Sequence, residues 1–477
     1  MTTHFQSSLF FYGGIAMISL TVKEVAQALK NLNDTSKWED VEITAVGFDT
    51  RKMVSGSLFV PLIGENDGHQ FIQSAIKNGA KAALWSAPLE DAPADFPVIL
   101  VEDTLIALQE LAQYYLKKVD PKVVAITGSN GKTTTKDMTD AVMSSRYRVY
   151  KTQGNFNNQI GLPITILSMP ADTEVVILEM GMSDKGEIEV LSRIAEPDIA
   201  IITMIGESHI EFLGSRANIA DAKMEITAGM KENSLLIYPG EEELLEERVK
   251  NLKGIQLKTF GTKESNNIYP LQVKNQMRET SFVTNVDPSI EVNIPVLGTY
   301  NVNNALAALT AGMALDIPIK ESYTPLAKFQ LTKNRTEWDE GINGSMILND
   351  SYNANPTAMK LVIENFSQLE SNGKKYVVLG DMLELGDLSE ELHVSVKEAL
   401  DPAKINEVYL YGTEMKVLQE ALLSEGRFAK ENIHHFTGDK HPLIEEVKQK
   451  LALDDYILIK SSFGTDLLSV VEALKAE

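Results

Sequence analysis

Short and almost uninterrupted apolar runs recur along the chain and alternate with stretches that have the spacing of amphipathic helices. In the middle of the sequence the runs are KVVAITG, EVVILEMG, PDIAIITMIG and SLLIYPG. None of them alternates between apolar and polar positions, which is typical of strands in a parallel sheet covered on both faces. From about residue 326 the pattern returns in SMILNDSY, KYVVLGD, EVYLYG and DYILIKSS, each followed by a helical stretch. The hydrophobic pattern therefore predicts an α/β fold with two doubly wound domains in series.

The first part of the chain predicts a separate, smaller α/β domain. It mixes short strands with helices such as TLIALQELAQYYLKKV. The pair Asp120-Pro121 marks its end, because the residue before a proline is disfavoured in a helix. Helical spacing first appears in MISLTVKEVAQALK, which begins at Met17, so we expect residues 1–16 to be an extension that adds nothing to the fold. The three expected domains cover residues 17–120, 121–325 and 326–477.

Composition and charge narrow the class of protein. A chain of 477 residues fits about three domains. The formal net charge of −23 argues against a nucleic-acid or anionic-membrane partner, because both would be repelled. The chain has no cysteine, which excludes disulfides, thiolate metal sites and cysteine nucleophiles. The apolar stretch Ser7–Leu20 lacks the basic segment of a signal peptide and is too short to span a membrane. We therefore expect a cytoplasmic protein, with a monomer as the default state.

The stretch VVAITGSNGKTTT, residues 123–135, has the features of a phosphate-binding loop in a shortened form. The common pattern is G-x-x-x-x-G-K-[ST], whereas this chain has G-x-x-G-K-T. A predicted strand precedes the loop and a predicted helix follows it, so backbone N–H groups and the helix N-terminus can meet phosphate. In such a loop Lys132 reaches the terminal phosphates and the Thr133 hydroxyl binds Mg²⁺. The alternative is an ordinary glycine turn between a strand and a helix. The residues expected to hold the nucleotide here are Thr127, Gly128, Ser129, Asn130, Gly131, Lys132, Thr133 and Thr134.

Two further candidates follow from the position of the strand ends. Glu179 ends the strand EVVILE, and His209 follows the strand DIAIITMI. Ligands of open α/β sheets collect at the carboxyl ends of the strands, so both residues are expected at the edge that carries the phosphate loop. Glu179 then offers a carboxylate to Mg²⁺. His209 taken alone is an ordinary loop histidine, and the shared edge is what favours a metal ligand.

Lys223 lies in SRANIADAKMEITAGM, which is predicted to be one helix with Ile219, Ile226 and Met230 on its apolar stripe. Lys223 falls inside that stripe, four residues after Ile219 and three before Ile226. Two interpretations stay open. Either the lysine stem lies along the core while the ammonium reaches water, or the amine faces inward and works near the phosphates.

The motifs as a group resemble the Mur ligase family, the ATP-dependent amide-bond-forming enzymes of peptidoglycan synthesis. The resemblance covers nearly everything after Met17. Its motifs are TGSNGKTTT, GNFNNQIGLP, EMGMSDKGEI, GTYNVNNALAAL, KNRTEW, NDSYNANP and VLGDMLELGDLS. The short G-x-x-G-K-T loop is the form this family uses. The resemblance implies a small α/β UDP-binding N-terminal domain, a central P-loop-type parallel-sheet ATPase domain and a C-terminal Rossmann-like domain.

The resemblance also assigns roles to residues of the central and C-terminal parts. Lys132 and Thr133 would bind the ATP phosphates and a first Mg²⁺, with Glu179 shared between two ions. His209 would bind the second ion, together with Lys223 as the carbamate that it forms with CO₂. The remaining roles that the resemblance implies are Asn157 and Asn158 near the reacting phosphate, Asn301 and Asn304 near the adenine, Arg335 at the terminal phosphate and Asp350 at the ribose.

In the first domain, DTRKMVSGSLFVPLIGENDGHQF resembles the UDP-sugar segment of the family, and its candidate contacts are Thr50, Arg51, Asn66 and His69.

Within the family, the motifs are most similar to those of the member that adds D-alanyl-D-alanine to UDP-MurNAc-tripeptide. ATP would first phosphorylate the tripeptide carboxylate, and the amine of the dipeptide would then attack the acyl phosphate. The residues expected to act in catalysis are Lys132, Lys223, Asn158 and Arg335.

Three other classes of protein fit these motifs less well. A folylpolyglutamate synthetase shares the loop but has no UDP-sugar domain before it, whereas about 120 residues precede the loop here. The sister ligase that adds the third amino acid would carry a D-N-P-R segment in its last domain, and this chain has none. A regulatory nucleotide switch would need neither NDSYNANP nor a whole second α/β domain.

Overall fold

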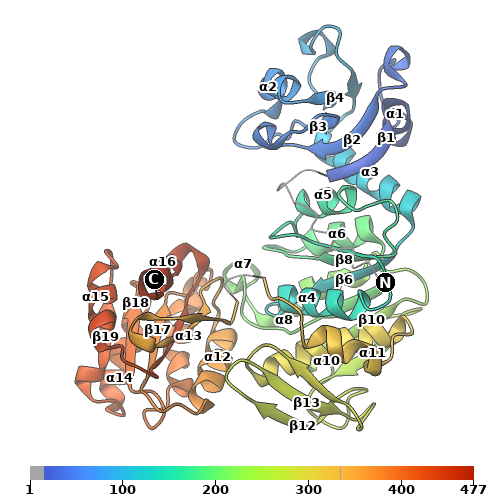
Figure 1. Ribbon diagram of the computed structural model, residues 1–477. Helices are drawn as coiled ribbons and strands as arrows, with labels where there is room; N and C mark the ends of the chain where they lie inside the picture. Colours follow the sequence, from blue (N-terminus) through green and yellow to red (C-terminus); the bar gives the residue numbers. More distant parts are fainter. Residues whose placement is uncertain (1–15, 333–334, 477) are drawn as a thin grey trace, which may run out of the picture. The chain divides into compact units, whose positions relative to one another are not determined.

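The computed structural model describes residues 16–332 and 335–476, and Figure 1 labels many of its helices and strands. The chain divides into two compact units. The first comprises the described residues 16–123 together with 148–180 and 190–196. The second comprises residues 124–147 and 181–189 and the described residues from 197 onward. Of the extension expected at residues 1–16, only residue 16 is described, and it is the first residue of a strand.

The first unit contains a five-stranded sheet with the strands in sequence order. Strand β1 is antiparallel to β2, and the other neighbours are parallel. The strands are β1 (Ala16–Thr21), β2 (Glu42–Gly47), β3 (Ser57–Phe59), β4 (Ala80–Trp85) and β5 (Val98–Leu100). The helices that accompany them are α1 (Val22–Leu29), α2 (Ile72–Lys77) and α3 (Thr104–Val119). Phe59, Trp85 and Ile72 belong to one buried cluster of this domain. The helix predicted over TLIALQELAQYYLKKV is confirmed as α3.

The helical spacing proposed from Met17 is wrong for its first residues. Residues 16–21 form β1, in which Ile18 and Leu20 are buried and Ser19 between them is exposed. A capping box starts α1 at Val22, since Thr21 Oγ1 accepts from the Glu24 N–H at 3.2 Å. The Thr21 N–H in turn donates to Glu24 Oε2 at 3.0 Å. At this cap the spacing of the core-facing residues changes from two, as in a strand, to 3.6, as in a helix. Helical spacing alone therefore does not reveal the strand.

The first unit also contains the parallel pair β7 (Val149–Lys151) and β8 (Val175–Glu179), with α5 (Gly161–Leu167) between them in sequence. The helix α6 (Glu187–Ala195) has residues in both units.

The second unit begins with four parallel strands whose order is β6-β9-β10-β11. The predicted runs KVVAITG, PDIAIITMIG and SLLIYPG are confirmed as three of them. The strands are β6 (Lys122–Thr127), β9 (Ile199–Ile202), β10 (Leu235–Pro239) and β11 (Gln256–Phe260). The helices are α4 (Lys132–Met143), α7 (Ile210–Leu213), α8 (Arg216–Met224), α9 (Glu243–Val249), α10 (Thr299–Ala314) and α11 (Ile319–Leu326).

Two features of this part differ from the sequence-based expectation. The helix predicted across SRANIADAKMEITAGM ends at Met224 and is followed by a 3-10 turn over Glu225–Thr227, so Met230 lies outside it. An antiparallel sheet of β12 (Pro270–Asn275), β13 (Thr280–Thr284) and β14 (Glu291–Ile294) was not predicted. Its outer strand β12 is mostly exposed, so it lacks the apolar run by which the parallel strands were recognised.

The last part of the second unit is a six-stranded sheet of order β15-β16-β20-β17-β18-β19. All neighbours are parallel except β15 and β16. The strands are β15 (Glu337–Glu340), β16 (Met346–Asp350), β17 (Lys375–Gly380), β18 (Glu407–Tyr411), β19 (Ile433–Phe436) and β20 (Tyr456–Lys460). The helices are α12 (Pro356–Gln368), α13 (Ser389–Ser395), α14 (Lys416–Glu425), α15 (His441–Lys450) and α16 (Leu468–Leu474). The four predicted strands are confirmed, and the two edge strands are additional.

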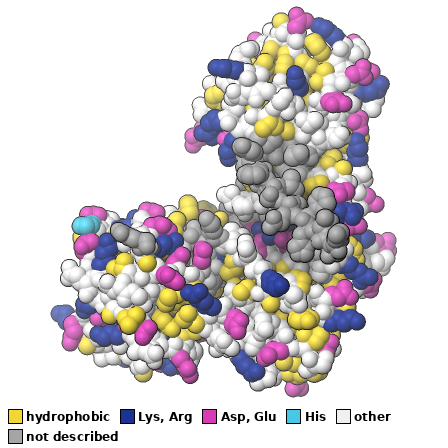
Figure 2. All heavy atoms as spheres, viewed as in Figure 1, with side chains coloured by type: hydrophobic (Ala, Val, Ile, Leu, Met, Phe, Trp, Pro, Cys, Tyr) yellow, Lys and Arg dark blue, Asp and Glu magenta, His cyan; other side chains and the backbone are white. Residues whose placement is uncertain are grey.

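Charged side chains of both signs are interspersed on the face shown in Figure 2. Within the described part of the chain, no helix combines the length and the apolar composition that crossing a membrane requires.

Candidate functional site

The phosphate loop lies between β6 and α4, as the sequence predicted. Gly128 has φ +147° and Gly131 has φ +78°, conformations that L side chains rarely adopt. A Cβ on Gly128 would lie 1.9 Å from Thr203 Oγ1, so the loop backbone runs directly against the end of β9. Gly131 is the N-cap of α4 and has no side chain to cap that helix. The loop therefore combines a fixed backbone with a helix N-terminus, which is the arrangement that binds phosphate.

The segment after β9 holds the loop in place. The Ser129 N–H donates to the Met204 carbonyl at 3.0 Å, and the Gly206 N–H donates to Ser129 Oγ at 2.9 Å. Lys132 folds back over the loop, where its Nζ donates to the Gly128 carbonyl at 2.9 Å. Thr127, Ser129 and Thr133 are buried.

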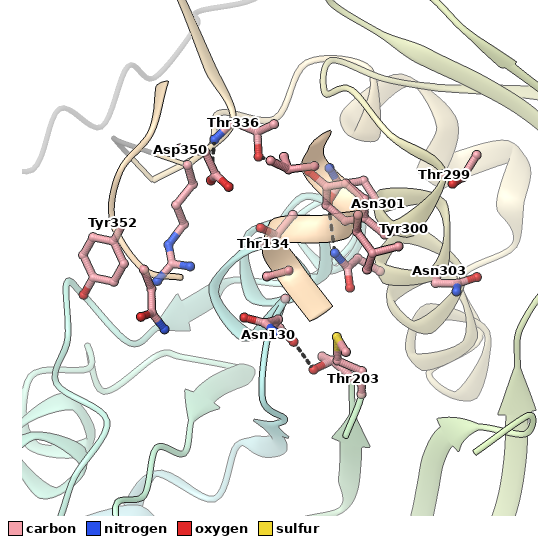
Figure 3. A pocket seen from close by; sticks show the side chains of 18 of the residues that line it. Asn130, Thr134, Thr203, Thr299, Tyr300, Asn301, Asn303, Thr336, Asp350 and Tyr352 are labelled. Carbon is pink, nitrogen blue, oxygen red and sulfur yellow. Dashed lines mark hydrogen bonds between the residues drawn. The ribbon is translucent and has the colours of Figure 1, made fainter. Parts of the chain in front are cut away.

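A cavity of about 350 Å³ opens beside this loop, within the size range of small-ligand sites (Figure 3). Its walls come from the loop, the end of β9, the start of α10, the segment around β16 and α12. The predicted nucleotide residues that line it are Asn130, Gly131, Thr134, Asn301, Asn304, Arg335 and Asp350. The lining residues that the sequence did not single out are Thr203, Met204, Thr262, Thr299, Tyr300, Asn303, Thr336, Tyr352, Asn353, Ala358, Leu361, Val362 and Lys460.

One side of the cavity carries the charged groups. The Arg335 guanidinium lies 4.1 Å from the centre of the Tyr352 ring, and its Nε is buried with no hydrogen-bond partner among the described residues. Asp350 forms an ion pair with Lys460 and accepts from the Thr336 N–H at 3.1 Å (Figure 3). A cation held over an aromatic ring with an unused donor is suited to a phosphate oxygen.

The start of α10 lines another side. Asn301 Nδ2 donates to the Leu297 carbonyl at 2.8 Å, and Asn304 Nδ2 donates to Asn301 Oδ1 at 3.0 Å. Asn304 comes close to the phosphate loop, because a Cβ on Gly131 would lie 2.6 Å from Asn304 Oδ1. Burial, more than the neighbouring Asp350 carboxylate, raises the pKa of Tyr300, so its phenol stays protonated.

His209 lies at the start of α7, with φ +64°. Its Nδ1 is 2.6 Å from Glu384 Oε2, although the contact lacks hydrogen-bond geometry. Burial, followed by the charges of Lys132 and Lys223, lowers the pKa of His209 to about 4. The imidazole is therefore neutral at neutral pH, the form that can bind a metal ion.

Lys223 lies on α8 and is only 1% exposed. A lysine whose ammonium reaches water would not be buried to this degree, so the inward-facing interpretation is favoured. Burial, followed by the charge of Lys132, lowers the pKa of Lys223 well below its usual value, while Glu225 and Glu187 oppose the shift. The result is an amine biased toward its neutral, nucleophilic form.

In the first unit, the predicted Glu179 ends β8 and is buried. Its Oε1 accepts from Asn157 Nδ2 at 2.9 Å. Asn158 Oδ1 accepts from the Gly161 N–H at 2.9 Å, at the start of α5. Asn157 is thus linked to the candidate carboxylate, whereas the oxygen of Asn158 holds the local backbone. Among the residues that the structure describes, no group of three or more His, Asp and Glu side chains is placed to hold a metal ion.

The candidate UDP-sugar residues follow the carboxyl ends of the parallel neighbours β2 and β3. Arg51 and Asn66 are exposed, and Thr50 is half-buried. Arg51 forms an ion pair with Asp49 at 2.8 Å. His69 differs from them, because both ring nitrogens contact the protein. Its Nδ1 is 2.6 Å from Asp67 Oδ1, and its Nε2 accepts from the Ser86 N–H at 3.1 Å.

Some lining residues that the sequence analysis missed have a recognisable signal. Tyr300 and Asn303 lie inside GTYNVNNALAAL, and Tyr352 and Asn353 lie inside NDSYNANP, so a wider reading of both motifs would have included them. Others, such as Thr262 in the loop after β11, have no local feature that points to a site.

The chain is similar to known proteins over most of its length. The chain matches the model of the Mur ligase middle domain over residues 126–312, that of the Mur ligase glutamate ligase domain over 334–463 and that of the Mur ligase family catalytic domain over 42–116. A Bacillus subtilis (strain 168) relative named UDP-N-acetylmuramoyl-tripeptide--D-alanyl-D-alanine ligase is 45% identical over 459 residues, which are 96% of this chain and 99% of that protein.

Two solved structures are similar over nearly their whole length. MurF from Acinetobacter baumannii superposes with a TM-score of 0.86 at 27% identity, covering 96% of this chain and 98% of that one. MurF ligase from Thermotoga maritima, solved in complex with ADP, superposes with a TM-score of 0.78 at 28% identity, covering 90% and 96%. The predicted three-domain α/β fold is confirmed. The chain belongs to the Mur ligase family of ATP-dependent ligases.

Proposed function

We propose that the protein adds D-alanyl-D-alanine to UDP-MurNAc-tripeptide at the expense of ATP, in the synthesis of peptidoglycan precursors. The observation that carries this proposal is the 45% identity to a ligase named for that reaction, over nearly the full length of both chains. The cavity beside the phosphate loop supports it, because phosphate-binding backbone, a stacked arginine and a carboxylate line the same space.

The chemistry requires an activated carboxylate. A carboxylate is a poor acyl donor, so the terminal phosphate of ATP is transferred to the tripeptide carboxylate to form an acyl phosphate. The dipeptide amine then attacks the acyl carbon, and phosphate leaves from the tetrahedral intermediate. Two anions have to approach each other in the first step, and we assign Lys132 and Arg335 to screen their repulsion in the transition state. We place the adenine near Asn301 and Asn304 and the ribose near Asp350.

We propose that Thr133, Glu179, His209 and the carbamate of Lys223 hold two Mg²⁺ ions, which neutralise phosphate charge when bound. The buried, neutral-biased amine of Lys223 supports the carbamate. Its nitrogen lone pair attacks the carbon of CO₂ and forms an N–C bond, while one C=O π bond opens and its electron pair moves to oxygen. The nitrogen then loses one proton to solvent, so the residue becomes an anion with two oxygens. Hard cations prefer such oxygen ligands. The neutral imidazole of His209 is in the protonation state that a metal ligand needs.

We assign the UDP end of the substrate to Thr50, Arg51, Asn66 and His69, on domain 17–120. The contacts of His69 to Asp67 and Ser86 fix the orientation of its ring in that segment. We assign the nucleotide to domain 121–325, with Asn157 and Asn158 near the reacting phosphate, and the dipeptide to domain 326–477. Closure of these domains around the acyl phosphate would keep water away until the amine arrives. We expect the protein to act in the cytoplasm as a monomer.

The test is phosphate release by the full chain, with the amide product identified by mass. Release should require ATP, UDP-MurNAc-tripeptide and D-alanyl-D-alanine together. Equal turnover of a folate with glutamate would instead support the folate ligase, and release from ATP alone would support a nucleotide switch. Lys132→Met should abolish turnover. Lys258→Met, at an exposed position of β11, is the matched control and should keep it.

A further inference from the structure

The phosphate loop and the start of α12 are joined by a reciprocal pair of side-chain amides. Asn130 Nδ2 donates to Asn355 Oδ1 at 3.1 Å, and Asn355 Nδ2 donates to Asn130 Oδ1 at 2.8 Å. Asn130 belongs to the loop and lines the cavity, as Figure 3 shows, whereas Asn355 is the N-cap of α12 and is 1% exposed. Each amide thus uses both a donor and an acceptor on its partner.

Asn355 has two further partners. Its Oδ1 also accepts from the Ala358 N–H at 2.9 Å, which caps α12. Its Nδ2 also donates to Ser208 Oγ at 2.8 Å, and that hydroxyl donates to the Ser129 carbonyl of the phosphate loop at 3.2 Å. One buried carboxamide therefore fixes the first turn of a helix and contacts the loop by two routes.

A second contact lies beside the first. Glu207 Oε2 accepts from Thr357 Oγ1 at 2.7 Å and from the Thr357 N–H at 3.2 Å. The Thr357 N–H belongs to the first turn of α12, where the backbone N–H groups have no partner within the helix and favour a carboxylate. Glu207 follows Gly206, whose N–H binds Ser129 of the loop.

Neither Asn355 nor Glu207 lines the cavity, but the helix that they hold does. Ala358, Leu361 and Val362 of α12 form part of the cavity wall. The position of α12 relative to the loop therefore sets the distance between the phosphate-binding backbone and that wall.

We infer that Asn355 and Glu207 are positioning residues that tie the phosphate loop to α12. Ordering of the loop and docking of the C-terminal sheet domain, the part of the chain with the six-stranded sheet β15–β20, then form one event. This inference rests on the proposed nucleotide site. Separating the two surfaces would leave the two amides, of which that of Asn355 is buried, and the Glu207 carboxylate without these partners, so the paired arrangement is favoured as a whole. A nucleotide that contacts both the loop and the wall formed by α12 binds this arrangement best and shifts the population toward it.

The experiment uses substitutions that keep the helix cap and weaken the tie. Asn355→Asp retains an oxygen for the Ala358 N–H, and aspartate is as good an N-cap as asparagine. It loses both donations from Nδ2. Glu207→Gln removes the charge, and Thr357→Val removes only the hydroxyl. Asp439→Asn, at an exposed acceptor for the N–H of His441 in the same domain, is the matched control.

Three quantities are measured on the full chain: ADP affinity by calorimetry, the radius of gyration with and without ADP by solution scattering, and KM for each substrate. Asn355→Asp and Glu207→Gln should weaken ADP binding and raise KM for ATP about tenfold. They should leave KM for the UDP-sugar substrate within about twofold and Tm within about 2 °C, because the cap is kept. We expect ADP to compact the parent protein, and both variants should reduce that compaction. The double variant Glu207→Gln with Thr357→Val should lose less than the product of the two single losses, since the two residues share one contact.

The inference is overturned if Asn355→Asp binds ADP and compacts like the parent, or if Tm falls far enough to account for the weaker binding. It is also overturned if the effects of Glu207→Gln and Thr357→Val multiply. If Asn355→Asp fails to fold, the ADP affinity and compaction of Thr357→Val decide whether the inference holds, because this variant keeps the backbone and the cap. If the parent binds ADP but forms no amide product, the proposed reaction fails, whereas the calorimetric and scattering results still judge the positioning roles.

Discussion

Replacing Lys223 by methionine would separate the contribution of this side chain to the reaction from its effect on the fold. Lys223 is 1% exposed, and burial lowers the pKa of its amine well below the usual value. Methionine fills a similar volume without a polar group that must lose its water. We therefore expect the free energy of unfolding to stay the same or to rise by about 1–2 kcal/mol. In Tm this corresponds to a gain of up to roughly 2–4 °C.

The same substitution should nearly abolish catalysis. If Lys223 works as a carbamate that holds a metal ion, methionine removes that contact from the transition state. Loss of one such electrostatic contact costs about 3–5 kcal/mol, which is roughly 10²–10⁴ in kcat. The assay is phosphate release at saturating substrates, with Tm measured by calorimetry on the same preparations. In the smaller variant Lys223→Ala, a short-chain carboxylic acid added to the buffer should restore part of the activity.

Lys375 offers a matched control in the C-terminal sheet domain. It is a buried lysine whose pKa is also lowered by burial, and its Nζ donates to the Ser367 carbonyl at 2.8 Å. Lys375→Met should lower stability by about 1–3 kcal/mol, because a buried carbonyl loses its donor, and should leave kcat unchanged. Lys223→Met with the kcat of the parent protein would refute the catalytic role and leave Lys223 as a packing residue.

Three further substitutions test other parts of the site and fold. Gly128→Ala should weaken ADP binding at least about a hundredfold by calorimetry, because the new Cβ overlaps the residue that follows β9. The control Gly214→Ala has a positive φ but open space around the new Cβ, so it should cost only about 1–2 kcal/mol of backbone strain. Equal losses of ADP affinity in the two variants would contradict the steric argument. Arg335→Lys keeps the charge but not the planar group over its aromatic neighbour, so kcat should fall about 10–100-fold, and an unchanged kcat would show that charge alone matters. Burial raises the pKa of Glu407, but hydrogen bonds, the largest from Lys450, outweigh it and hold that pKa below 4.5. The ionised Glu407 carboxylate therefore stabilises the fold above pH 4.5, and this stabilisation is lost as the pH falls through the lowered pKa. The difference in Tm between the parent and Glu407→Gln should then disappear in acid. A difference in Tm that does not depend on pH would refute the ionic role.

The apolar pattern and the loop motif were enough to predict much of this protein. Eight strands were recognised as uninterrupted apolar runs, because strands covered on both faces need apolar residues at every position. The phosphate loop was predicted because glycine, lysine and threonine at that spacing meet a local backbone requirement. In both cases neighbouring residues carry the signal. The edge strand β12 lacked it, since exposed positions tolerate polar residues.

The tertiary structure decided what depends on depth and on distant partners. Spacing put Lys223 on an apolar stripe, but a helical period gives the direction of a side chain and not how far it lies from water. His69 stays a predicted UDP-sugar contact, but the sequence did not show that Asp67 and Ser86 contact its two ring nitrogens. The pairing of Asn130 with Asn355 joins residues 225 positions apart. No local pattern records such a contact, because it forms only when two separately folded segments pack together and bury the same polar groups.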